Sequence, residues 1–136
     1  MTTLLVFSGE PALRERVRMA IGRSPAAGID SITYLEADTA GAVIAAVDAG
    51  GIDLVVLDAE AWPAGGLGIS RELKNSRSDC PPIVVLVARR DDRWLGVWSQ
   101  ADAVLPQPID AIELSTTVAR LLTGAPVTEA TIKETL

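Results

Sequence analysis

The sequence DLVVLDAEAWPAGGL, residues 53–67, holds four consecutive aliphatic residues that lead directly into an acidic residue and then a glycine-rich turn. Similar apolar runs lie at residues 4–7, 32–35, 83–87 and 103–105. Most of these runs are rich in Val, Leu and Ile and do not alternate with polar residues, which is typical of parallel strands covered on both faces. We therefore predict five strands of a buried parallel sheet.

The segments between these runs are 15–25 residues long, enough for a crossover helix in each. In the first segment Pro11 is placed to begin a helix and Gly22 to end it, with Arg14 on the face opposite the apolar residues. Further helices are predicted to end at Gly50, to cover residues 67–75, and to end at Gly124. This alternation predicts an α/β fold with a doubly wound parallel sheet and helices on both faces.

Composition limits the possible functions. The 136 residues include 12 Lys and Arg, 18 Asp and Glu, one Cys and no His. Without His the chain has no Ser/His/Asp triad, no phosphohistidine of its own and no His-ligated metal. The net charge of −6 argues against nucleic-acid binding, and the apolar runs are far shorter than the ~20 residues that span a bilayer.

Length and cysteine usage predict one folded domain in the cytoplasm. We place this domain at residues 1–123, followed by a tail at residues 124–136 that forms a short helix or is disordered. The lone Cys80 cannot form an intrachain disulfide, and no charged leader with an apolar core opens the sequence. A reducing compartment fits these features.

Ligands of open parallel sheets bind beyond the carboxyl ends of the strands, so these ends are the places to look for chemistry. Ser8, Gly9 and Glu10 follow the first strand. The other candidate residues are Asp58 at the end of the third strand, Val87 at the end of the fourth and Gln107 after the fifth.

Over residues 1–123 the chain resembles the receiver domain of two-component response regulators. The resemblance rests on element order, on EPALR at residues 10–14, on Asp58, and on Gly66 and Leu67 at the family's spacing after it. It implies a flavodoxin-like sheet in the order 2-1-3-4-5, with Asp58 as the residue that accepts a phosphoryl group from the phosphohistidine of a partner kinase. It also implies a cis bond between Gln107 and Pro108.

The chain departs from the receiver pattern around Asp58. Ser8 and Gly9 occupy the positions of an acidic pair, and other departures are Val87 for a hydroxyl residue, Val104 for the switch aromatic and Gln107 for a lysine. Phosphoryl transfer requires Mg²⁺ and a fixed cation to neutralise charge. Glu10 and Asp58 alone would give a weak Mg²⁺ site that is expected to be lost. We therefore predict no cofactor, with Mg²⁺ only if the protein is phosphorylated.

Two loop arginines, Arg89 and Arg90, are candidates for a substitute cation near Asp58. Asp91 and Asp92 follow them directly, and such neighbours more often form solvated surface pairs. We favour the surface pairs.

A possible interaction surface lies in RWLGVWSQA, residues 93–101. On a helix, the apolar residues of this segment span an arc of about 160°, wider than the ~100° stripe that a surface helix buries: Trp94, Leu95, Val97, Trp98 and Ala101. Part of a tryptophan is therefore expected to be exposed. The resemblance places Trp94, Trp98 and Val104 on a face that dimerises or contacts output partners. Alternatively both tryptophans pack against strand ends, with Gly96 and Ser99 facing solvent.

Three functions follow from these observations. The first is a stand-alone, atypical receiver (a pseudo-receiver) that is not an enzyme and acts through contacts with a signalling protein, such as a histidine kinase or a separate output protein, or through a homodimer. The second is a receiver that is phosphorylated on Asp58 by a histidine kinase. The third is a small-molecule binder on the flavodoxin-like scaffold, since a fold does not fix a function.

Overall fold

Strands and helices alternate along the chain in the computed structural model, which describes residues 2–29, 31–61 and 65–124. The strands are β1 (Thr2–Phe7), β2 (Ile32–Ala37), β3 (Leu54–Asp58), β4 (Ile83–Val87) and β5 (Ala103–Pro106). The helices are α1 (Pro11–Ile21), α2 (Ala40–Ala49), α3 (Gly66–Ser76), α4 (Arg93–Ser99) and α5 (Ala111–Thr123), and a 3-10 turn at Arg90–Asp92 precedes α4.

The five strands form one parallel sheet in the order β2-β1-β3-β4-β5, which confirms the predicted topology. In the centre, Val56 of β3 lies between Val6 of β1 and Val84 of β4. All five residues of β3 and of β4 are buried, whereas Leu35 on the edge strand β2 is exposed. The uninterrupted apolar runs therefore mark the strands that are covered on both faces.

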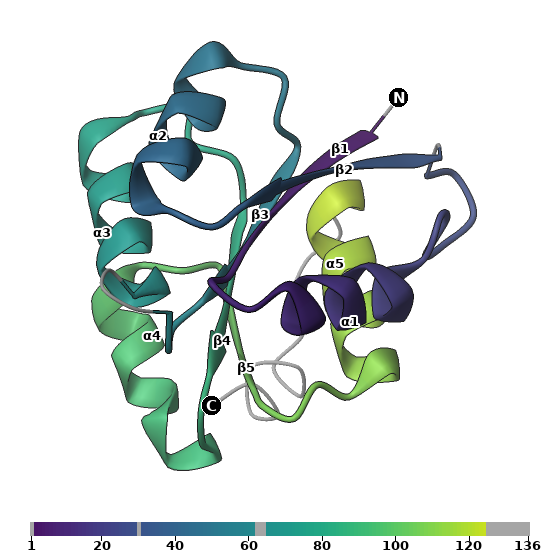
Figure 1. Cartoon of the computed structure of the whole chain (residues 1–136). Coiled ribbons are helices and arrows are strands. Elements are labelled where there is room, and N and C mark those ends of the chain that lie inside the picture. The colour runs from purple at the N-terminus through teal and green to yellow at the C-terminus, as the bar shows by residue number, and fades with distance from the viewer. Residues whose placement is uncertain (1, 30, 62–64, 125–136) are drawn as a thin grey trace.

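Helices cover both faces of the sheet, as predicted (Figure 1). On one face α1 and α5 lie side by side, and the apolar cluster beneath them includes Val17, Val56 and Leu114. On the other face lie α2, α3 and α4, above a cluster that includes Leu57 and Leu73. Successive residues of β3 alternate between these two clusters, as the pleat of a strand requires.

The helix ends follow the local sequence signals. Pro11 is the first residue of α1, where its missing N–H costs no hydrogen bond, and Gly22, Gly50 and Gly124 follow three helices with positive φ angles. Helix α3 begins one residue earlier than predicted and ends one residue later, at Gly66 and Ser76. At these helices the predicted boundaries therefore lie within one residue of the observed ones.

The last part of the chain contains the predicted cis bond and the predicted tail. The bond between Gln107 and Pro108 is cis, as the resemblance implied. The predicted tail lies outside the described residues from position 125 onward. Among the helices that are described, none is long and apolar enough to cross a membrane.

Candidate functional site

Four of the predicted site residues meet at one edge of the sheet, because the carboxyl ends of parallel strands lie together. Ser8 directly follows β1, Asp58 ends β3, Val87 ends β4 and Gln107 directly follows β5. The sheet places these strands next to one another in the order β1, β3, β4, β5. The order of the strands, and not proximity in the sequence, therefore builds the site.

The carboxylate of Asp58 is buried and accepts three hydrogen bonds from the described residues, and each of these donors is uncharged. The Ser8 hydroxyl donates to Oδ2 over 2.8 Å, and the backbone N–H of Glu60 donates to Oδ1 over 2.9 Å. The side-chain amide of Gln107 donates to Oδ1 over 3.3 Å. Asp58 is only 5% exposed, so these bonds replace the water that burial removes.

The loop between β1 and α1 is held by a group that the sequence did not reveal. Arg14 donates from Nη1 to the carbonyl oxygen of Ser8 over 2.6 Å, and from Nε to a carboxylate oxygen of Glu36 over 2.9 Å. The Ser8 hydroxyl also accepts a hydrogen bond from the N–H of Glu10. Arg14 was expected on the outward face of α1, but it bridges the ends of β1 and β2. The available signals were its position one turn after the loop and its place at the end of EPALR, residues 10–14.

The acidic groups at this edge do not form a good magnesium site. Both oxygens of Asp58 already accept hydrogen bonds, Ser8 is neutral, and Gly9 and Glu10 are exposed. Within the described part of the chain, no group of three Asp, Glu, Cys or His side chains could hold a metal ion. Mg²⁺ is held through carboxylates together with water and phosphate, and these residues do not fit that requirement.

In β4 and β5, apolar side chains occupy the positions where receivers carry polar or aromatic groups. Val87 is 1% exposed and packs in the apolar cluster beneath α2, α3 and α4. Val104 is also buried and belongs to the same cluster. Val104 therefore lies below the surface and does not itself form part of an exposed interaction face.

A cleft of about 420 Å³ lies beside Asp58, and Glu60 and Gln107 form part of its wall. The arginine that lines this cleft is Arg16 of α1, not Arg89 or Arg90. Arg89 instead pairs with Asp92 at 3.3 Å on the surface, which is the arrangement that we favoured for these loop charges.

Helix α4 exposes its apolar residues. Trp94, Val97 and Trp98 are 66%, 67% and 49% exposed, whereas Gly96 and Ser99 are buried. The prediction of a partly exposed tryptophan is confirmed. The alternative in which both tryptophans pack against strand ends, with Gly96 and Ser99 facing solvent, is wrong.

Gly96 explains why α4 turns this way. A Cβ atom at Gly96 would lie 1.8 Å from Cγ2 of Val104, so the helix backbone rests directly on the β5 side chain. This close approach fixes the glycine side of α4 against the sheet and leaves the opposite, apolar side outward.

Comparisons with known proteins agree with this architecture. No family model matches the chain. Uncharacterized response regulatory proteins from two strains of Mycobacterium tuberculosis are 47% identical over 119 residues, which cover 88% of this chain and 90% of each relative.

Solved structures show the same fold. The signal receiver domain of a histidine kinase from Syntrophus aciditrophicus superimposes with a TM-score of 0.76 at 19% identity, covering 96% of each chain. The response regulator TrrA of Thermotoga maritima, solved with Mg²⁺ and BeF, gives a TM-score of 0.74 at 27% identity and covers 90% of this chain and all of its own. The protein therefore belongs to the response regulators of two-component signalling, and the residues described here have the fold of their receiver domain.

Proposed function

We propose that this protein is an atypical receiver that acts through protein contacts, with little or no phosphorylation of Asp58. The observation that carries the proposal is the set of neutral donors around Asp58: the Ser8 hydroxyl, the Glu60 N–H and the Gln107 amide. An acyl phosphate on this carboxylate would add negative charge where, among the described residues, every donor to Asp58 is neutral, and where Ser8 and Gly9 stand in place of a carboxylate pair for Mg²⁺.

A phosphoryl group on Asp58 would break present hydrogen bonds and would find few contacts to replace them. Hydrogen bonds from neutral donors stabilise the buried carboxylate as it stands, and a phosphoryl group on either oxygen would displace at least one of them. Val87 has no hydroxyl to bind a phosphoryl oxygen, and its side chain is buried in the apolar cluster. The product therefore lacks the contacts that would both form it and pass its signal to the end of β4.

The test is mass spectrometry of the intact protein after incubation with Mg²⁺ and a small phosphodonor such as acetyl phosphate. We expect no gain of a phosphoryl group. A variant that combines Ser8→Asp with Gln107→Lys restores an acid and a cation at this edge, and is expected to be labelled more than the natural chain. Robust labelling of the natural chain that disappears in Asp58→Asn would establish the competing function, a phosphorylated receiver served by a histidine kinase.

The same proposal assigns the partners. A protein without a working phosphoryl site signals by binding a signalling protein, such as a histidine kinase or a separate output protein, and performs no catalysis of its own. Receivers can also form homodimers through the face built from α4, β5 and α5, and sedimentation of the purified protein measures this directly. We place the protein in the cytoplasm, where two-component partners meet their receivers.

A further inference from the structure

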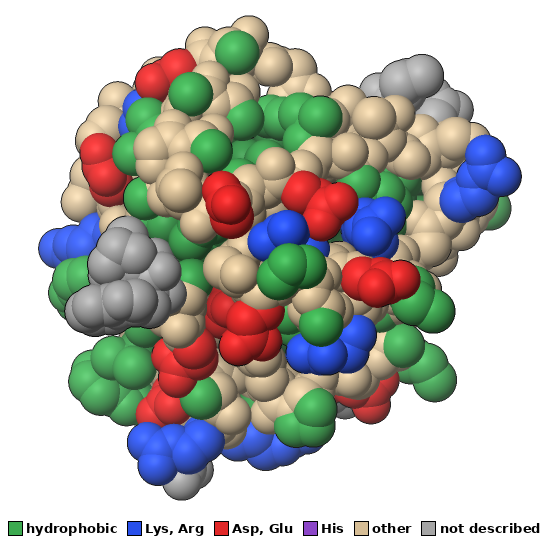
Figure 2. Space-filling view, in the orientation of Figure 1, with side chains coloured by type: hydrophobic (Ala, Val, Ile, Leu, Met, Phe, Trp, Pro, Cys, Tyr) green, Lys and Arg blue, Asp and Glu red, His purple; other side chains and the backbone are tan. Residues whose placement is uncertain are grey.

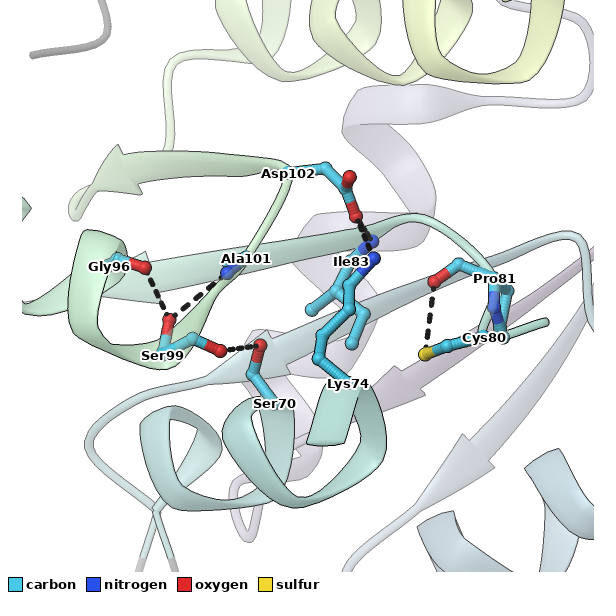
Figure 3. A network of polar contacts seen from close by, with 9 residues as sticks. All are labelled: Ser70, Lys74, Cys80, Pro81, Ile83, Gly96, Ser99, Ala101 and Asp102. Atoms are coloured by element: carbon cyan, nitrogen blue, oxygen red, sulfur yellow. Dashed lines mark hydrogen bonds and ion pairs between the residues drawn. The ribbon is translucent and has the colours of Figure 1, made fainter. Parts of the chain in front are cut away.

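Polar contacts link α3 to the end of α4 and to the turn that follows it. The Ser70 hydroxyl of α3 donates to the carbonyl oxygen of Ser99 over 2.9 Å, and the Ser99 hydroxyl donates to the Gly96 carbonyl over 2.7 Å (Figure 3). Lys74 of α3 pairs with Asp102, directly before β5, at 2.7 Å. Together with the close approach of Gly96 to Val104, these contacts fix the orientation of α4.

The outward side of α4 is an apolar surface on this fixed support. Trp94, Val97 and Trp98 lie within about 100° of arc on the helix, and each is at least 49% exposed. Figure 2 shows hydrophobic side chains gathered over α4, with a basic side chain bordering them over α3. We call Trp94, Val97, Trp98 and the adjoining Arg71 the α4 surface. Exposed tryptophan and arginine are the residue types that most often carry binding energy at protein interfaces.

Arg71 gives this surface a positive charge without an internal counter-charge. Its guanidinium lies 4.7 Å from the centre of the Trp98 ring and donates to the Trp98 carbonyl oxygen over 2.7 Å. Two other cations of α3 and the residue after it are paired, Lys74 with Asp102 and Arg77 with Asp48. Among the described residues, no ion pair joins Arg71 to a carboxylate.

We propose that the α4 surface binds an acidic, amphipathic segment of a partner protein. Apolar side chains of the segment would cover Trp94 and Val97, and a carboxylate would pair with Arg71 beside Trp98. This inference rests on the proposed function, because it identifies the partner's chemistry for a receiver that signals by contact. The fixed support implies that the surface exists without any change at Asp58.

A second copy of the chain fits this surface less well. A two-fold dimer centred on the α4 surface would place the same residues of both copies opposite each other. Two Arg71 guanidiniums would then enter one small interface without supplying the carboxylate that either of them needs. The unmatched charge therefore favours a different, acidic partner.

Two synthetic helical peptides of equal length test the proposal, each with leucines at positions i, i+3, i+4 and i+7. The other positions are mainly Glu in one peptide and mainly Lys in the other. Titration is followed by the indole N–H signals in NMR and by peptide fluorescence anisotropy. The chain has a net charge of −6, so non-specific attraction would favour the basic peptide.

We expect the acidic peptide to bind at least about tenfold more tightly than the basic one and to shift the indole signals of Trp94 and Trp98. Arg71→Glu should reverse the preference, and Trp94→Ala should weaken binding of the acidic peptide. The matched control is Arg23→Glu, which makes the same charge change at an exposed arginine in the loop after α1 and should leave the preference unchanged.

Equal binding of both peptides, binding that Arg71→Glu does not alter, or a dimer whose contacts cover Trp94 and Trp98 would overturn the proposal. Asp58→Asn separates this result from the proposed function. Acidic-peptide binding that is the same in Asp58→Asn and in the natural chain supports a phosphorylation-independent surface. Failure of peptide binding with no labelling of Asp58 rejects the α4 surface alone, whereas labelling of Asp58 rejects the proposed function.

Discussion

The residues around Asp58 bind its carboxylate through neutral hydrogen-bond donors. A carboxylate at the position of Ser8 would lie beside the Asp58 oxygen that Ser8 now contacts at 2.8 Å, and two such charges require a cation between or beside them. Gln107 likewise contributes a neutral amide where receivers carry a lysine. If only the lysine were replaced by Gln107, an acid at the position of Ser8 and the Asp58 carboxylate would face each other without a cation. Neutral residues at both positions, Ser8 and Gln107, avoid this repulsion.

A single glycine determines which side of α4 faces outward, and Gly96→Ala tests this directly. The added methyl group would overlap Val104, and such overpacking costs about 1–3 kcal/mol of the free energy of unfolding. Urea unfolding followed by circular dichroism measures the loss.

The matched control for this prediction is Gly68→Ala in α3, where an added Cβ meets nothing within 4 Å. There the substitution is expected to stabilise the protein by about 0.5–1 kcal/mol, because alanine favours the helix. Adding Val104→Ala to Gly96→Ala should recover part of the loss through a coupling of the two sites. An unchanged midpoint for Gly96→Ala would contradict the close approach.

At the scale of elements, a tyrosine joins the edge strand β2 to the end of α1. The Tyr34 hydroxyl donates to the carbonyl oxygen of Gly22 over 2.5 Å, directly after the helix. Burial raises the pKa of Tyr34 to about 12, and Arg18 opposes part of that rise. The folded protein therefore retains the phenol proton at a pH where the unfolded chain has lost it.

This difference predicts a loss of stability at high pH. Between about pH 10 and 12 the unfolded chain releases the Tyr34 proton while the folded protein holds it, so unfolding becomes easier as the pH rises. Tyr34→Phe has no such proton and should show a shallower decline of the free energy of unfolding over that range. Tyr34 is the one tyrosine of the chain, so ultraviolet titration of tyrosinate reads its pKa directly. A midpoint near 10 in the folded protein would refute the prediction.

Sequence patterns predicted the long elements well because each carries a signal of its own. The run IVVLV coincides with β4, and Pro11 and Gly22 mark the beginning and end of α1. Helix α4 was harder because its apolar residues do not mark its buried side. The burial of Gly96 and the exposure of Val97 follow from the contact with Val104, a tertiary relation that helical periodicity does not contain.

At the scale of the whole molecule, the sheet order brings distant residues into one site. The sequence placed Ser8, Asp58 and Gln107 at the same edge because each follows or ends a predicted strand. It did not predict the hydrogen bonds among them, which join residues about 50 positions apart. It also missed Arg14, since a helix pattern assigns an arginine to an outer face without showing that the end of β2 lies beside it.

The layered architecture predicts how stability is distributed, and amide hydrogen exchange measures this distribution. Strands β1, β3 and β4 are paired on both sides, whereas β2 and β5 form the edges. We expect the slowest exchange in β3 and β4, at rates set by global unfolding, and faster exchange in β2, where local opening suffices. Leu57→Ala, at a fully buried site, should lower stability by about 2–5 kcal/mol and accelerate exchange in the central strands. Leu35→Ala, at an exposed position of β2, is the matched control and should leave the central strands protected. Equal protection of β2 and β3 in the natural protein would mean that the edge opens only with the whole domain, contrary to this prediction.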